Sequence, residues 1–208
     1  MSSNDITPRY AVASLLVGAG LWGVIWYPMR LLEVAGLAGI WLTFIMYAAA
    51  LVASLPRTAG CVREFIGGWR LLVPLAIAGG WTNTAFVLAI LESNVLRVML
   101  LFYLSPIWTV LLGWAMLDER IKAGSVMVLA VALVGATLLL WDPSTGGPWP
   151  SGFADWLALS AGMAFATSNV LTRKASGVRT ETKSLSVWIG VAVISFAVII
   201  LFHVPRPT

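Results

Sequence analysis

The chain of 208 residues is 60% hydrophobic and only 11% charged, with a mean hydropathy of +0.91, which excludes an ordinary soluble domain and indicates an integral membrane protein. Its formal net charge of +4 does not indicate nucleic-acid binding, because the Lys and Arg residues lie in short stretches between apolar runs and form no single patch. Cys61 is the only cysteine, which excludes an intrachain disulfide and a multi-cysteine metal site.

Seven apolar runs are each about long enough to cross the hydrocarbon core of a bilayer as a helix. A sliding window of about nineteen residues places them at 10–29, 37–55, 71–91, 95–116, 124–141, 153–172 and 184–203. The predicted fold class is therefore an all-α membrane protein, a polytopic bundle of about seven transmembrane helices. Arg9 is the only basic residue before the first run, and no clean cleavage site follows, so we predict a retained helix and not a signal peptide.

Aromatic and polar residues mark the first and third runs. Trp22 and Trp26 are four residues apart and so share one helix face. In the third run, Asn83 places an amide at mid-depth close to Trp81. A polar side chain in hydrocarbon needs a partner, which is a neighbouring helix, a solute in a water-filled cavity, or both, since the two roles are compatible. For the deep rings of Trp22, Trp81 and Tyr103, cavity lining and an ordinary structural role are equally open.

Pro106 lies in the middle of the fourth run, directly after Ser105. Proline cannot donate a backbone hydrogen bond and clashes with the preceding turn, so we predict a kink or a local opening at mid-membrane. The run ends in the charged turn 118–122, where the chain meets water. In the sixth run, Ser168 and Asn169 have the same two interpretations as the amide of the third run.

The basic residues indicate the orientation of the chain. With the N-terminus in the cytoplasm, only Arg30, Arg97 and Arg206 among the Lys and Arg residues fall outside. We therefore predict a multi-pass protein of the bacterial inner membrane with a cytoplasmic N-terminus. Glu92 and Arg97 flank the outer turn between the third and fourth runs, where long charged side chains either reach water or form a gate of ion pairs.

A weak internal repeat appears when the chain is compared with itself at an offset of 143 residues. The small pair Ala19 and Gly23 then falls on Gly162 and Ala166, so the same helix face is open to close packing in both copies. Because this offset contains five spans, the second copy enters the membrane in the opposite sense, as in alternating-access transporters. We predict a first five-helix repeat at 1–142, an external linker rich in Pro and Gly at 143–152, and the first two helices of an incomplete second repeat at 153–208.

The fourth and fifth runs contain Leu100-Leu101-Phe102-Tyr103, Pro106, Glu119, Gly124 and Gly135. In this combination they resemble the fourth and fifth helices of the EamA-type permeases in the drug/metabolite transporter superfamily. The family more often has Gly before that Glu, where this chain has Asp118. Because members typically have ten helices, this chain resembles the first seven and lacks the last three.

The resemblance implies a secondary transporter, an exporter of small metabolites such as amino acids, that works by alternating access. It also implies a solute cavity lined from the first, third, fourth and sixth spans. The residues that we expect to contact the solute or to shape this cavity are Trp22, Trp26, Trp81, Asn83, Tyr103, Pro106, Ser168 and Asn169. The expected partners are the lipid bilayer, a small-molecule solute, and either a second copy of the chain or another chain that supplies the missing helices. No nucleic acid, cofactor or metal is expected.

Two alternatives belong to other classes of function. One is a non-transporting membrane subunit or an inactive truncated fragment, because the second repeat is incomplete. The other, a seven-helix receptor, is disfavoured in its retinal form, because retinal needs a lysine inside the last helix and residues 185–202 contain none. The motifs H-E-x-x-H, G-x-S-x-G and the phosphate-binding loop do not occur, so no enzymatic activity is expected.

Overall fold

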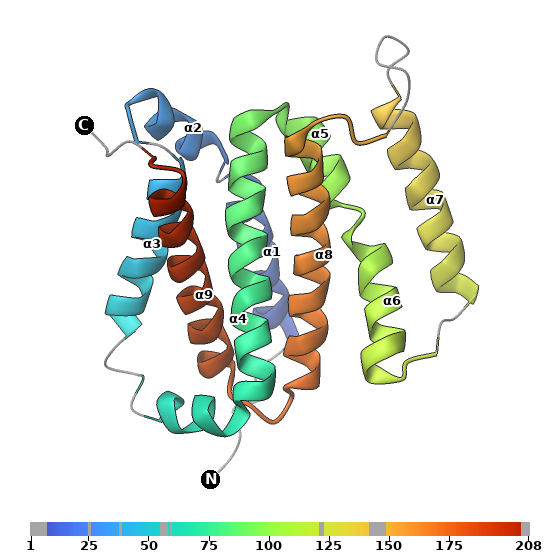
Figure 1. The fold of residues 1–208 in the computed structure, drawn as a ribbon. Coiled ribbons are helices and arrows are strands. Elements are labelled where there is room, and N and C mark those ends of the chain that lie inside the picture. Colours follow the sequence, from blue (N-terminus) through green and yellow to red (C-terminus); the bar gives the residue numbers. More distant parts are fainter. Residues whose placement is uncertain are drawn as a thin grey trace.

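The computed structural model describes residues 8–24, 26–37, 39–54, 58, 60–120, 123–141 and 149–204, which form helices joined by short turns (Figure 1). The helices are α1 (Pro8–Val24), α2 (Trp26–Val34), α3 (Gly39–Ser54), α4 (Cys61–Glu92), α5 (Val95–Phe102), α6 (Ser105–Leu117), α7 (Ala123–Leu140), α8 (Phe153–Lys174) and α9 (Thr180–Leu201). The predicted all-α class is confirmed.

The lengths and apolarity of these helices agree with a polytopic membrane bundle. Three stretches are long and apolar enough to cross a bilayer, namely α4, α5 together with α6, and α9. Shorter apolar helices lie at Val12–Leu21, Gly39–Ser54 and Ala123–Leu138. Helix α8 is 22 residues long and carries its charges near its ends, with Asp155 in the first turn and two basic residues in the last. Each predicted span corresponds to one helix or to two consecutive helices, so the predicted multi-pass bundle is confirmed.

Two spans differ from their predicted bounds. The described residues of the first run lie in α1 and α2, and α2 extends to Val34, beyond the predicted end at residue 29. The third run begins at Cys61 instead of residue 71. Arg63, Glu64 and Arg70 lower the hydropathy of this first part without preventing a helix, so a hydropathy window does not detect it.

Helix α4 is bent. Figure 1 shows its first part lying across the bottom of the view and its long part rising through the centre of the bundle. The helix contains Gly67, Gly68 and Pro74. Pro74 cannot donate the hydrogen bond that would reach the Arg70 carbonyl, and adjacent glycines add backbone freedom. These are common causes of a sharp bend in a helix.

Helix α4 packs between α8 and α9, and α3 packs on α9 (Figure 1). The contact with α9 is so close that a Cβ atom on Gly190 would lie 1.8 Å from the Ala76 carbonyl oxygen, and one on Gly80 would lie 2.5 Å from the Gly190 backbone. Residues without side chains let two membrane helices approach to this distance. The contact among α4, α5 and α8 is an apolar cluster of Ala85, Phe86, Ala89, Val98, Leu101, Phe102, Leu157, Ala158 and Ala161.

Charged groups from distant parts of the chain meet at one end of the bundle, which we call the basic end. It contains Arg173, Lys174, Arg179 and Lys183. Glu64, near the start of α4, bonds Arg179, directly before α9, so α4 and α9 both begin at this end. Helices α1 and α8 run in opposite directions along the bundle, and so do α3 and α9 (Figure 1).

The fourth run is interrupted. Helix α5 ends at Phe102 and α6 begins at Ser105, with Tyr103 and Leu104 in a turn between them. Pro106 lies in the first turn of α6, where its fixed φ suits a helix start. The predicted opening of this span at Pro106 is confirmed.

Candidate functional site

The turn between α5 and α6 leaves a backbone carbonyl without its usual helical partner. Pro106 has no N–H, so it cannot donate to the carbonyl of Phe102 four residues earlier. That carbonyl oxygen lies against α8, where a Cβ atom on Gly162 would be only 2.9 Å from it. The N–H of Tyr103 still donates to the Met99 carbonyl at 2.8 Å, so α5 closes normally before the interruption. The interrupted backbone therefore rests directly on α8.

A cavity of about 260 Å³ opens between this turn and α7. It is lined by Leu100, Tyr103, Leu104, Pro106, Ile107, Leu129, Ala132, Leu133, Gly135 and Ala136. The lining is largely apolar, and Tyr103 is 63% exposed. Two of the predicted site residues, Tyr103 and Pro106, therefore lie together in the wall of one cavity.

Trp81 lies on α4 and is oriented by α8. Its Nε1–H donates to the hydroxyl oxygen of Ser160 at 3.1 Å, and that hydroxyl donates to the Leu157 carbonyl at 2.8 Å. The indole remains 36% exposed, so the bond to Ser160 fixes the ring without burying it. Ser160 was not among the predicted residues, because a single hydroxyl in an apolar run is common and carries no distinctive pattern.

Asn83 joins two helices. Its amide oxygen accepts a hydrogen bond from the Tyr47 hydroxyl of α3 at 2.8 Å, and its amide nitrogen donates to the Gly79 carbonyl of α4 at 2.8 Å. Of the two interpretations that the sequence left open, the structure shows the interhelical bond. The Asn83 side chain therefore links α3 to α4.

Trp81 and the interrupted span lie at the same level of the bundle. Trp81 bonds Ser160, and Gly162, which supports the Phe102 carbonyl, follows only two residues later on α8. The Phe102 ring also contacts Phe86 of α4, with the ring centroids 4.9 Å apart. We call this level, with Trp81, Phe102, Tyr103, Ser160 and Gly162, the middle layer.

The remaining predicted residues lie elsewhere or are not described. Ser168 and Asn169 follow Ser160 by eight and nine residues on α8, which places them about 12 Å or more further along the helix toward the basic end. The Ser168 hydroxyl donates to a carbonyl of its own helix at 2.9 Å. The side chains of Trp22 and Trp26 lie outside the described part of the chain.

An ion pair between a partly buried arginine and a buried aspartate lies at the end of the bundle opposite the basic end. The Arg97 guanidinium donates from Nε to Asp155 Oδ1 and from Nη2 to Asp155 Oδ2, both at 2.9 Å. Asp155 also accepts from the Ser151 N–H at 2.9 Å, and Arg97 donates to the Trp149 carbonyl at 3.1 Å. Of the two predictions for Arg97, the structure shows an ion pair, formed with an acid 58 residues away that the sequence did not indicate as its partner.

Ion pairs at the basic end are more exposed. Glu119, after α6, pairs with Arg173 of α8, and the two side chains are 45% and 54% exposed. Glu64 pairs with Arg179 at 3.1 Å and accepts a hydrogen bond from the Thr182 hydroxyl. The hydrogen bond that the Arg179 guanidinium donates to Glu64 raises the pKa of Arg179.

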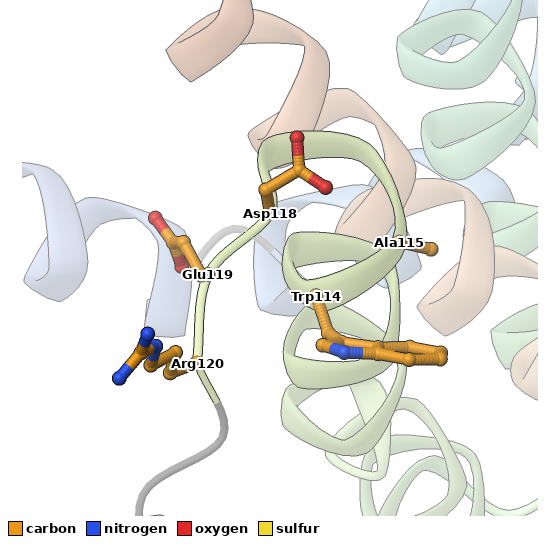
Figure 2. A pocket seen from close by; sticks show the side chains of 5 residues that line it. All are labelled: Trp114, Ala115, Asp118, Glu119 and Arg120. Atoms are coloured by element: carbon orange, nitrogen blue, oxygen red, sulfur yellow. The ribbon is translucent and has the colours of Figure 1, made fainter.

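A hollow of about 780 Å³ lies beside Glu119 at the end of α6 (Figure 2). It is lined by Trp114, Ala115, Asp118, Glu119 and Arg120. Figure 2 shows the Glu119 side chain pointing away from α6 on one side and the Trp114 ring lying on another. Asp118 ends α6 with a φ of 55°, in the left-handed region that glycine adopts most easily. Asp is among the non-glycine residues that tolerate this conformation best.

Comparison with known proteins places these features in a family context. The family model of the EamA-like transporters matches residues 9–141. A protein of Archaeoglobus fulgidus named as an uncharacterized transporter is 27% identical over 132 residues, which are 64% of this chain and 46% of that protein. The chain therefore spans about half the length of this curated relative. No solved structure matches the chain.

Proposed function

The chain belongs to the EamA-like transporter family, and from this premise we propose that it is a secondary transporter that exports small amphipathic metabolites such as amino acids. The observation that carries the proposal is the interruption of the fourth span at Tyr103 and Leu104. Interrupted helices near the midplane mark solute sites in many secondary transporters, because they leave backbone groups free for the solute. Here the interruption borders a cavity between α7 and the paired helices α5 and α6.

We place the solute at the middle layer. Tyr103 lines the cavity, and Trp81 bonds Ser160 where α4 meets α8. The two rings offer apolar faces, and the Ser160 hydroxyl offers a hydrogen-bonding group. An amphipathic solute with one apolar and one polar part matches this combination. Asn83 supports the site by holding α3 against α4. In this proposal Trp22, Trp26, Ser168 and Asn169 line the path on either side of the middle layer.

The proposed mechanism is alternating access between the repeat at 1–142 and the second repeat that begins at 153, after the linker 143–152. The opposite directions of α1 and α8, and of α3 and α9, support this organisation. We propose that the basic end faces the cytoplasm of a bacterial inner membrane, because Lys and Arg accumulate on the cytoplasmic side. Export then moves the solute from the basic end to the end that contains Arg97 and Asp155.

Efflux measurements test this proposal. Cells that express the chain are loaded with a panel of labelled amino acids, and export is followed for the unsubstituted chain, Trp81→Ala and Asn83→Ala. We expect Trp81→Ala to reduce export of at least one solute about tenfold, since a lost apolar contact in a solute site changes discrimination by that order. Trp141→Ala is the matched control, because this tryptophan is 60% exposed at the end of α7 and belongs to no proposed contact.

The second half of the test measures transport by the purified protein in liposomes. A chain that exports in cells but not in liposomes would indicate a subunit that depends on another protein, contrary to the proposal. Equal export by the unsubstituted chain and by both substituted chains, for every solute exported, would remove the middle layer from the transport path.

A further inference from the structure

Ion pairs join the two predicted repeats at both ends of the bundle. Among the described residues, the pairs are Arg97 with Asp155, Glu119 with Arg173, and Glu64 with Arg179. In each pair one residue belongs to the region 1–142 and the other to the region 153–208. In a transporter that opens between its repeats, contacts that bridge them at one end must break before that end can open. The three pairs therefore occupy the positions that gates require.

The pairs at the two ends differ in burial, since the Glu119 and Glu64 side chains at the basic end are 45% and 24% exposed. The side chain of Asp155 is 4% exposed, and its carboxylate accepts from both Arg97 and Ser151. Arg97 also binds the Trp149 carbonyl, so the pair ties the start of α5 to the start of α8 and to the residues before α8. Breaking a buried pair is costly because it leaves a charge without a partner, whereas exposed pairs contribute little.

The hollow at the end of α6 adds an independent observation. A volume of about 780 Å³ lies beside Glu119 at the basic end, whereas at the opposite end the Asp155 carboxylate is buried against Arg97 and Ser151. The described conformation is thus held more firmly at the Asp155 end than at the basic end.

We propose that Arg97 and Asp155 form the outer gate of the transporter, and that Glu119 with Arg173 and Glu64 with Arg179 form a weaker inner gate. This inference rests on the proposed function and assigns gating residues to it. When the outer gate opens, the starts of α5 and α8 separate, and water replaces the partner of each charge. The buried outer pair biases the resting chain toward the cytoplasmic side, where an exporter collects its solute.

Thiol labelling from each side of the membrane tests the gate. Cys61→Ser removes the native thiol, and Ser160→Cys places a reporter in the middle layer. Membrane-impermeant thiol reagents are applied to vesicles of both orientations. Asp155→Asn, which keeps the shape of the side chain and removes its charge, is expected to speed labelling from the outer side at least about tenfold, the ratio that a shift of 1.4 kcal/mol between two states produces. Arg97→Lys keeps the charge without the two-point contact and is expected to give a smaller rise.

Glu119→Gln is the matched control, because it removes one carboxylate charge from a pair at the other end. Because weakening the inner gate favours the state open to the cytoplasm, it is expected not to raise outer-side labelling. Unchanged outer labelling in both Asp155→Asn and Arg97→Lys would overturn the inference. An equal rise from both sides would also overturn it, because such a rise reports a loosened bundle and not an opened gate.

The labelling result does not depend on which solute is exported. If no solute of the panel is exported but Asp155→Asn changes labelling on the outer side alone, the proposed function fails and the gate assignment stands. If export is measured but labelling does not respond, the gate assignment fails and the proposed function stands.

Discussion

Glycines have very different surroundings in two parts of the bundle. One part is the contact between α4 and α9 at Ala76, Gly80 and Gly190, which we call the seam, and the other is α7. At the seam, a Cβ atom on Gly190 would lie 1.8 Å from the Ala76 carbonyl oxygen. On α7, a Cβ atom on Gly124 or Gly135 would meet nothing within 4 Å among the described residues. Glycine therefore permits close backbone packing at the seam, and on α7 it has no such role in this conformation.

This difference distinguishes a closely packed part of the bundle from a loosely packed part. Closely packed backbones have few alternative arrangements, because any shift creates clashes or voids. The seam joins α4 of the first predicted repeat to α9 of the second, so we infer that it acts as the pivot about which the two ends open. Helix α7 contacts the rest of the described bundle mainly through α5, beside the cavity at the interrupted span.

The largest effect that this comparison predicts is that of Gly190→Ala. The added methyl group would force α9 away from Ala76, so we expect the free energy of unfolding to fall by about 3 kcal/mol. Equilibrium unfolding in mixed detergent micelles measures it. Gly124→Ala is the control, and its added methyl group is expected to stabilise α7 slightly by replacing a poor helix former. A Gly190→Ala protein as stable as the control would show that the seam is not the pivot.

A smaller effect is expected where α8 meets the interrupted span. In Gly162→Ala the new methyl group would approach the Phe102 carbonyl oxygen to 2.9 Å, so the turn must shift by a few tenths of an ångström. We expect a loss of about 1 kcal/mol in stability, together with altered export, because the shift reaches Tyr103. Unfolding and efflux are measured on the same variant. A change in stability without any change in efflux would separate this contact from the solute path.

The local features of the fold were predictable from the sequence, whereas the partners of its polar groups were not. Apolar length identified the spans, and Pro106 identified the interruption, because both effects act within a few residues. The start of α4 at Cys61 was missed, since hydropathy reports membrane depth and not helix formation. The first turns of α4 are helical, but their charged residues lower the mean hydropathy, so a hydropathy window does not assign them to the span.

In the candidate site, too, the sequence predicted which residues need a partner but not which residues supply it. The need of Asn83 for a partner followed from its depth, but Tyr47 lies 36 residues away and no local pattern connects the two. Asp155 was missed because an acid near the start of a span looks like an ordinary helix end until Arg97 is placed beside it. Pairing between distant residues depends on how the helices pack, which spacing along one chain does not encode.

A weaker effect is expected for Tyr47→Phe, which removes the bond between α3 and α4 and keeps the ring. Hydrogen bonds between membrane helices contribute about 0.6 kcal/mol on average, so we expect a loss of that order. The comparison is with Gly190→Ala, measured by the same unfolding assay. If the loss for Tyr47→Phe equals that for Gly190→Ala, polar contacts hold the bundle as strongly as backbone packing does, and the contrast between seam and surroundings fails.

The smallest predicted effect concerns Thr84, a fully buried residue of α4. No described group accepts or donates a hydrogen bond at its hydroxyl, whereas the hydroxyl of Thr82, two residues earlier, donates to the Ala78 carbonyl at 2.8 Å. Because a buried hydroxyl without a partner is costly, Thr84→Val is expected to leave stability unchanged or to raise it by up to about 0.5 kcal/mol.

Thr82→Val is the control for this pair, since it removes a hydroxyl whose hydrogen bond is satisfied. We expect Thr84→Val to be the more stable of the two variants in the same unfolding assay. If Thr84→Val is instead the less stable by more than about 1 kcal/mol, its hydroxyl has a partner such as a bound water. A water at that depth would mean that solvent reaches the central helix, and that α4 is part of the path as well as part of the pivot.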